Sequence, residues 1–288
     1  MPRCRDRVYP QQKIHPQTSG RWSTTDPPLA QLPKKLRNIV MPDPGWAWIK
    51  FDFDQIEPRL GAALANDTPS LEWFAKGYDY HTLNMCDFLE IPFPPVLTKA
   101  CHTAPECEAW RQQIHWEGDG DIRRKFAKSF SLRLDYGGDP ASAGDVPGAK
   151  QLGFTKERLV RAANSFLAAH PAKAAYRNRI REEALRTRTI RTFNGRRRKL
   201  NGEPEEIIRE AFNHPLQGGV ADIFNITLIR IYEELEGRVK WVFGMHDAQT
   251  WACKEEDYAR CQKQINEIVH RPWDIGNGAV VVFSASFD

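Results

Sequence analysis

Residues 46–59, with the sequence WAWIKFDFDQIEPR, constrain the fold of this chain more than any other stretch. From position 46 to 51 the residues are mostly apolar and favour β-structure, so they predict a buried strand that delivers a carboxylate, Asp52, at its end. An acid in that place is costly to bury unless a positive charge meets it. Magnesium suits this role because hard cations take carboxylate oxygens, and the alternative is an ordinary acid in the turn after a strand.

A second acid is predicted to stand at a strand end near the C-terminus. Residues 239–243 and 250–253 are expected to form the two strands of a hairpin whose turn, 244–248, carries His246 and Asp247. Asp52 and Asp247 are therefore two acids, far apart in sequence, that strands deliver at their ends. Together with the cationic helix that lies between them in sequence, they indicate a site for metal ions and a polyphosphate.

That helix is predicted in the stretch 122–138, IRRKFAKSFSLRLDYGG. Arg124, Lys128, Leu132 and Tyr136 recur every four residues, so they lie along one stripe of the helix, which the following pair of glycines ends. An ordinary amphipathic helix separates its charged residues from its apolar ones. A mixed stripe suits a triphosphate at one end and a base at the other, although basic residues on a solvated helix surface are the common alternative.

The length and composition describe a soluble globular protein. With 288 residues and 41% hydrophobic content, the chain can form one large domain or a core with an inserted subdomain. No apolar run approaches the length of a membrane span, and the start has no apolar stretch typical of a signal peptide. We therefore expect no membrane partner and a cytoplasmic location, which would be the host cytoplasm for a viral protein.

Cysteine usage and local charge add two further indications. The six cysteines form no CxxC pair, which suits reduced thiols, and the cluster of Cys101, His102 and Cys107 is only weak evidence for zinc. The net charge is only +4, but residues 173–199 carry eleven Lys or Arg residues against two acids. This block favours a surface that neutralises phosphates over a solvated helix face.

The remaining segments are predicted to be mainly helical. Residues 1–45 should be loops and short strands, with Arg21 in the loop 18–33, and the segment 77–82 should be a connection. Arg209, Asn213 and Gln217 recur every four residues and form a polar stripe on a helical region that is interrupted near residues 215–219. Helices are expected at 56–65, 70–75, near 106–116 within an otherwise irregular 87–122, at 155–187 and at 205–235.

These motifs, in this order, resemble the catalytic portion of family A DNA polymerases, the family of bacterial DNA polymerase I. The resemblance covers roughly residues 18–282. DFDQIEPR at 52–59, RKFAKSFSLRLDYG at 124–137 and MHD at 245–247 are similar to the three signature motifs of the family. The stretches GYDYHT, TFNGRRR and NHPLQGGVADI fit between them in the family's order.

The resemblance implies an α+β fold. It consists of a polymerase palm, with an antiparallel sheet flanked by helices, and a helical fingers subdomain. Residues 1–61, with N-terminal loops, would form the first part of the palm, 62–200 the fingers, and 201–288 the second part of the palm with the catalytic hairpin. The thumb and exonuclease domains of family members would be absent, so we expect a separate thumb-bearing partner, as in a split polymerase of viral type, or an excised fragment.

The resemblance also implies template-directed addition of deoxynucleotides to a primer 3′ end. Two Mg²⁺ ions, for which Mn²⁺ can substitute, would be held by Asp52, Asp247 and the main-chain carbonyl of Phe53. Lys128 would join Asp52 and Asp247 as a catalytic residue. The residues implied to bind the nucleotide, beyond Phe53, are Gln55, Glu57, His81, Arg124, Lys128, Leu132 and Tyr136.

Within that set, Glu57 would select deoxynucleotides by crowding the 2′ position of the sugar, and Tyr136 would stack near the nascent base pair. The residues implied to contact primer–template DNA are Arg21, Arg209, Asn213, Gln217 and His246.

The sequence departs from the family pattern at two positions that matter. Ala248 stands where the third motif usually has Glu, and Leu132 stands where the family has Phe or Tyr. The first departure removes an accessory carboxylate and should lower the rate without abolishing the chemistry. It also favours the competing interpretation, a non-catalytic DNA-binding or assembly subunit that retains the polymerase fold. An RNA-copying enzyme is disfavoured by Glu57.

Overall fold

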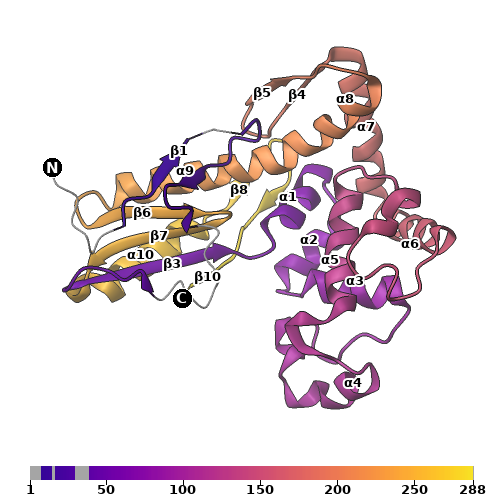
Figure 1. Cartoon of the computed structure of the whole chain (residues 1–288), viewed down its shortest axis with the longest axis horizontal. Helices are drawn as coiled ribbons and strands as arrows, with labels where there is room; N and C mark the ends of the chain where they lie inside the picture. The colour runs from indigo at the N-terminus through magenta and orange to yellow at the C-terminus, as the bar shows by residue number, and fades with distance from the viewer. Residues whose placement is uncertain (1–7, 15–16, 30–38, 288) are drawn as a thin grey trace.

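The structure is a computed structural model that describes residues 8–14, 17–29 and 39–287. The start of the chain and part of the predicted loop 18–33 lie outside these residues. Figure 1 shows two regions. One contains the main sheet and two helices packed with it, and the other is a cluster of helices. Within the described ranges, no helix has both the length and the apolar character needed to cross a membrane.

The main sheet is antiparallel and has the strand order β10-β3-β7-β6. Side chains alternate along β3, so that Ile49, Phe51 and Phe53 enter the core while Lys50 and Asp52 point to the other face. The strands of the chain are β1 (Gln11–Lys13), β2 (Ser23–Thr25), β3 (Trp46–Phe53), β4 (Thr189–Arg191), β5 (Arg197–Lys199), β6 (Val239–Met245), β7 (Ala248–Lys254), β8 (Trp273–Asp274), β9 (Val280–Val281) and β10 (Ala285–Phe287).

Helices make up the rest of the fold. They are α1 (Ile56–Ala65), α2 (Thr68–Ala75), α3 (Tyr80–Leu89), α4 (Glu108–Gln113), α5 (Ile122–Asp135), α6 (Lys156–Ala169), α7 (Pro171–Thr187), α8 (Pro204–Asn213), α9 (Gly219–Glu234) and α10 (Tyr258–Val269). Short 3-10 turns lie at Lys99–His102, Pro105–Cys107, Gly118–Gly120, Pro140–Asp145 and Glu255–Asp257, and one π turn at His214–Gly218 joins α8 to α9.

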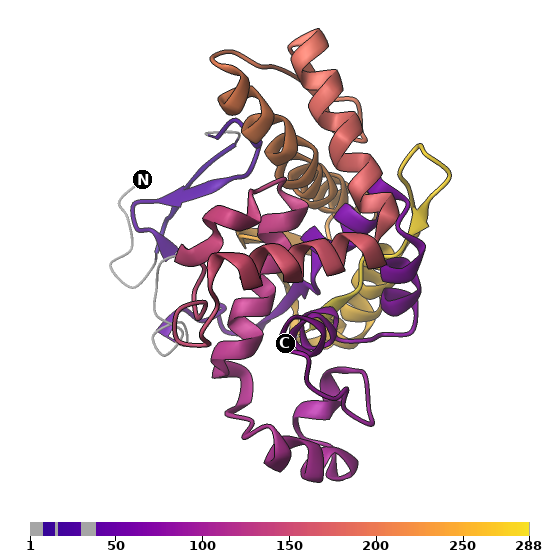
Figure 2. The same cartoon turned by 90° about the vertical axis from the view of Figure 1, so that its right-hand side faces the viewer.

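Two large hydrophobic cores and a small cluster of Ala62, Phe74 and Tyr80 hold the described elements together. The larger core lies between the sheet and helices α9 and α10, where Cys261, Ile265 and Ile268 form the buried stripe of α10. The smaller core lies inside the helical cluster, and α5 contributes Phe126 and Phe130 to it. Figure 2 views this cluster from its own side, with the sheet behind it.

The sequence analysis predicted this mixed architecture of an antiparallel sheet and helices, and the structure confirms it. The division at residues 61 and 200 remains a prediction. One observation favours this division, because the smaller core draws only on residues 85–167. Another does not, because α7, inside the expected fingers region, packs into the larger core through Tyr176 and Ile180.

Two local predictions were wrong in detail. The segment 77–82 is only partly a connection, because α3 begins at Tyr80 and carries His81 in its first turn. The hairpin turn is shorter than 244–248, because Met245 already pairs with Ala248. The turn therefore consists of His246 and Asp247 alone, with His246 in the left-handed backbone region at φ 56°.

Candidate active site

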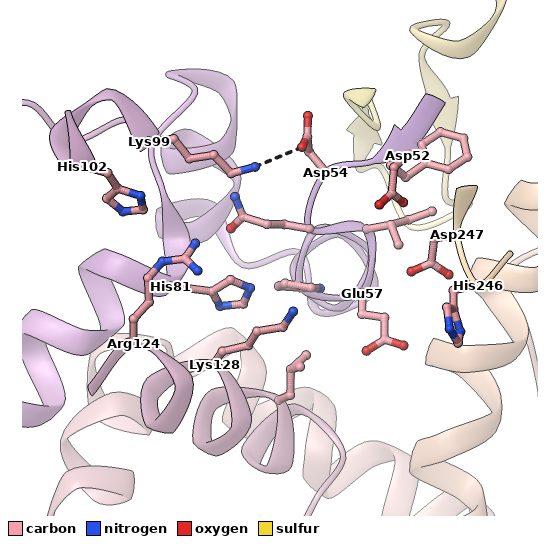
Figure 3. A pocket seen from close by; sticks show the side chains of 15 residues that line it. Asp52, Asp54, Glu57, His81, Lys99, His102, Arg124, Lys128, His246 and Asp247 are labelled. Carbon is pink, nitrogen blue, oxygen red and sulfur yellow. Dashed lines mark hydrogen bonds and ion pairs between the residues drawn. The ribbon is translucent and has the colours of Figure 1, made fainter. Parts of the chain in front are cut away.

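The structure brings the two predicted acids together at one end of the sheet. Asp52 lies on β3 and pairs across the ladder with Ala248, the residue that follows Asp247. Directly opposed residues of antiparallel strands have Cα atoms about 4.5–5.5 Å apart, so the tight turn places Asp247 beside Asp52. Figure 3 shows the two carboxylates side by side at the edge of a cavity.

The carboxyl group of Asp247 has a raised pKa. Burial raises its pKa to about 6, the neighbouring Arg21 counteracts this shift, and Glu57 and Asp52 add to it through repulsion. Three carboxylates thus concentrate negative potential at this end of the sheet. A cation at this place would relieve that repulsion.

Arg21 supplies part of the positive charge. Its Nη2 atom lies 2.6 Å from Oε1 of Glu57 and 3.5 Å from Oδ1 of Asp247. The sequence analysis assigned Arg21 to a contact with primer–template DNA, and the structure places it against these carboxylates. A contact between Arg21 and DNA remains a prediction.

The donor set is suited to a hard dication. Among the described residues, no group of three or more His, Cys, Asp or Glu side chains has the arrangement of a metal site. The predicted site does not require one, because Mg²⁺ usually takes one or two carboxylates and completes its shell with water and substrate phosphates. Asp52, Phe53 and Asp247 all line the cavity, and the two carboxylates with the carbonyl of Phe53 could serve as such oxygen ligands.

Helix α5 forms the wall opposite the carboxylates. Arg124, Lys128 and Leu132 from its predicted stripe line the cavity, whose volume is about 500 Å³. Tyr136 follows the end of α5 and does not line the cavity. The next residue, Gly137, has φ 70°, and a Cβ atom on it would collide with the ring of Phe212, so the end of α5 packs closely against α8.

Arg124 is less available than its place on the stripe suggests. Its Nε and Nη2 atoms donate to the carboxylate of Asp79, with the Nη2–Oδ1 distance at 3.0 Å. Burial alone would raise the pKa of Asp79, but a hydrogen bond from His102 and the charge of Arg124 outweigh it and hold the pKa well below its usual range. The guanidinium is therefore fixed by a fully ionised, buried partner.

His81 also lines the cavity, from the first turn of α3. It is 3% exposed, and burial together with the charge of Arg124 lowers its pKa to about 3, so the ring is neutral at pH 7. Its buried Nδ1 atom has no hydrogen-bond partner. His81 is therefore suited to bind a phosphate as a neutral hydrogen-bonding group.

Gln55 also lines the cavity, and like His246 it has a left-handed backbone, with φ 52°. Such conformations in non-glycine residues cluster at functional sites.

Among the predicted DNA contacts, Arg209 and His246 are exposed, while Asn213 and Gln217 are half-buried, at the end of α8 and in the π turn that follows it. A contact between these residues and DNA remains a prediction.

The sequence analysis missed four residues with ionisable side chains around the cavity. Asp54, Lys99 and His102 line it, and Asp79 holds Arg124 beside it. Asp54 is part of the first motif and could have been noticed as an extra acid there. Lys99 and His102 come from the irregular stretch 87–122, where no periodicity points to a site. The zinc interpretation of the Cys101 cluster gains no support, because its side chains do not form one of the three-ligand groups that could hold a metal ion, none of which occurs among the described residues.

Comparisons with known proteins identify the family of this chain. The family model described as "DNA polymerase family A" matches residues 1–100 and 113–276. Among curated proteins, the chain is 24% identical over 271 residues to the thermostable DNA polymerase I of Thermus thermophilus, covering 89% of this chain and 29% of that protein. It is 25% identical to DNA polymerase I of Geobacillus stearothermophilus, covering 88% of this chain and 28% of that protein.

A solved structure shows the same fold. It is the POL domain of Pol1 from M. smegmatis in complex with DNA primer-template and dNTP, with a TM-score of 0.75 and 22% sequence identity. The match covers 98% of this chain and 47% of that one. The chain thus spans less than a third of the two curated relatives above and about half of the solved domain. On the extent of the family match, the chain belongs to DNA polymerase family A.

Proposed function

We propose that this chain is the palm and fingers unit of a template-directed DNA polymerase, which adds deoxynucleotides to a primer 3′ end by a two-metal mechanism. The observation that carries the proposal is the meeting of Asp52 and Asp247 at one edge of a cavity whose opposite wall is the cationic stripe of α5. The naming of the curated relatives as DNA polymerase I supports the same activity.

Asp52, Asp247 and the carbonyl of Phe53 would hold Mg²⁺, and Mn²⁺ can substitute because it accepts the same oxygen ligands. When bound, the ions would lower the pKa of the primer hydroxyl and neutralise the triphosphate. The raised pKa of Asp247 supports this assignment, since burial and, to a lesser extent, repulsion from Glu57 and Asp52 disfavour its charge, and a cation would offset both.

The residues of α5 would act on the other end of the nucleotide. Lys128 is exposed to the cavity and would donate to a phosphate oxygen, stabilising the charge that develops on the leaving pyrophosphate. Arg124, His81 and Gln55 would complete the phosphate contacts. Their fixed positions would limit the reorganisation needed when the nucleotide arrives.

Base and sugar would lie between α5 and the carboxylates. Tyr136 and Leu132 would pack near the nascent base pair, and Glu57 would exclude a ribose 2′-hydroxyl. Glu57 is suited to this role because its bond to Arg21 fixes the carboxylate in place. On the duplex side, donors from Arg21, Arg209, Asn213 and Gln217 would test the minor groove, which presents similar acceptors for A·T and T·A pairs. His246 would also contact the DNA.

A further part of the proposal concerns the grip on DNA. The residues described here would hold the duplex through palm and fingers, and we propose that a partner polypeptide with thumb contacts increases the number of nucleotides added per binding event. Primer extension under single-encounter conditions tests this. Long products from the chain alone, unchanged by candidate partners from the same genome, viral or cellular, would contradict it.

The competing function is a non-catalytic DNA-binding subunit with a polymerase fold, favoured by Ala248. Single-nucleotide incorporation with Mg²⁺ and a primer–template distinguishes the two. We expect incorporation by the wild type and loss to background in Asp52→Asn and Asp247→Asn. The matched control is Glu236→Gln, which removes an exposed acid after α9 and should have no effect. If both site variants incorporated nucleotide at the wild-type rate, the site assignment would be wrong.

A further inference from the structure

The cavity offers less mobile positive charge than the family motif implies. Arg124 is held by the buried Asp79, and His81 is neutral at pH 7. Lys128, on the α5 stripe, has an exposed side chain and lines the cavity. A metal-bound triphosphate still carries net negative charge, so another cation that can move toward it would strengthen binding.

Lys99 is placed to be that cation. It lies at the start of the 3-10 turn Lys99–His102 and lines the same cavity as Lys128. Its Nζ atom donates to Oδ1 of Asp54 at 3.2 Å, across the space between the helical cluster and the end of β3 (Figure 3). The hydroxyl of Ser286 donates to both oxygens of Asp54, at 2.9 and 3.0 Å, and so fixes the carboxylate.

The Lys99–Asp54 pair is readily exchanged. The Lys99 side chain is 57% exposed, and exposed ion pairs contribute little to stability because water screens them. A phosphate group could therefore replace Asp54 as the partner of Lys99 at small cost. The Arg124–Asp79 pair differs, because Asp79 has no exposed surface and cannot release its partner cheaply.

The chain builds a specific support for Lys99. The neighbouring residues 101–112 lie outside the family match. Arg111 donates to the carbonyls of Cys101 and Ala104, each at 2.9 Å, and Trp116 packs on His102 with ring centroids 4.9 Å apart. These contacts order the irregular stretch and hold the 3-10 turn over the cavity. Lys99 is thus held by a packed element rather than by a loose loop.

We propose that Lys99 is a further triphosphate-binding residue of this chain, which exchanges Asp54 for a phosphate oxygen when the nucleotide enters, and that Asp54 is its positioning residue. The inference rests on the proposed function, since it concerns the same nucleotide site. It goes beyond the family motifs because Lys99 belongs to none of the three, and Arg111 and His102, which support its turn, lie where the family model does not match.

The test compares Lys99→Ala with Lys76→Ala. Lys76 is a matched control because it is also 57% exposed and also pairs with an acid, Glu72, but lies outside the cavity. With primer–template and Mg²⁺, Lys99→Ala should raise the KM for the deoxynucleoside triphosphate about tenfold and leave kcat within about twofold. Lys99→Arg should restore most of the affinity, and Lys76→Ala should match the wild type.

Two further measurements separate a phosphate contact from a structural effect. The inhibition constant of inorganic pyrophosphate should rise with the KM in Lys99→Ala, while the unfolding temperature stays that of Lys76→Ala. Asp54→Asn removes the carboxylate that positions Lys99. It should raise the KM without changing the unfolding temperature. An unchanged KM and pyrophosphate inhibition in Lys99→Ala, or a loss confined to kcat, would overturn the inference.

Calorimetric titration of the triphosphate, with Ca²⁺ in place of Mg²⁺ to prevent turnover, keeps the inference separate from the proposed function. If the wild type binds the triphosphate but adds no nucleotide, the proposed function fails, and a weaker affinity in Lys99→Ala still supports the inference. If the wild type adds nucleotide and Lys99→Ala binds equally well, only the inference fails. If the wild type neither binds nor adds nucleotide, both fail.

Discussion

Replacing Asp79 by Asn should destabilise the protein strongly, because it leaves Arg124 without its counter-charge. The carboxylate of Asp79 has no exposed surface and receives bonds from Arg124 and from Thr82, the latter at 2.6 Å. Breaking a buried ion pair by removing one partner costs about 3–5 kcal/mol. Arg124 keeps 16% of its side-chain surface exposed, so we expect a value near the lower end, about 3 kcal/mol.

Urea unfolding followed by circular dichroism measures this loss. With a slope of about 3 kcal/mol per molar urea, the midpoint should fall by about 1 M at pH 7. The same helix provides a matched control, since Arg133 of α5 pairs at 3.4 Å with Asp145, whose side chain is 76% exposed. Asp145→Asn should change stability by less than about 0.5 kcal/mol.

The effect should also depend on pH in a defined direction. Because the pKa of Asp79 is lower in the folded protein than in the unfolded chain, its contribution is complete above the unfolded pKa of about 3.9. The contribution is lost as the pH falls below that value toward the folded pKa. The difference between wild type and Asp79→Asn should therefore be constant from pH 7 to 5 and shrink below about pH 4. Equal stability of the two proteins at pH 7 would refute the reasoning.

Three further predictions concern the site and its supports. Lys128→Ala should lower the rate of single-turnover nucleotide addition about 100-fold with an unchanged circular dichroism spectrum, and a loss below about threefold would exclude a catalytic role. Glu57→Ala should raise ribonucleotide use relative to deoxynucleotide use at least about tenfold in kcat/KM, whereas an unchanged ratio would remove Glu57 and its Arg21 contact from sugar selection. Gly137→Ala should lower the free energy of unfolding by about 1–3 kcal/mol, because alanine is strained at φ 70° and meets Phe212; thermal unfolding at the wild-type temperature would contradict this.

Patterns with a period were predictable from the sequence. The apolar run that ends at Asp52 became β3, and the four-residue spacing of Arg124, Lys128 and Leu132 placed these side chains in one cavity. The hairpin that carries Asp247 was also found, because its strands are rich in β-favouring residues. These features depend on local geometry, which the order of residues largely determines.

Contacts between distant and irregular segments were not predictable. The stretch 92–121 is ordered by side chains that bond main-chain carbonyls, as when Trp110 donates to the carbonyl of Pro92 at 2.7 Å. Such bonds leave no periodic trace in the sequence. For the same reason the pairing of Lys99 with Asp54 was missed, and the stripe of α5 gave no sign that Asp79 would hold Arg124.

The turn between β6 and β7 has only two residues, so the number of residues in this hairpin, rather than side-chain packing, sets the distance between Asp52 and Asp247. Adding or deleting one residue in this hairpin would shift the strands by one position and turn Asp247 toward the opposite face of the sheet. Changes of residue type along β7 can be accommodated by repacking, whereas a residue added in the turn moves Asp247 unless it forms another bulge like the one between Trp241 and Phe243. Single-residue insertions here should therefore abolish activity even in variants that remain folded.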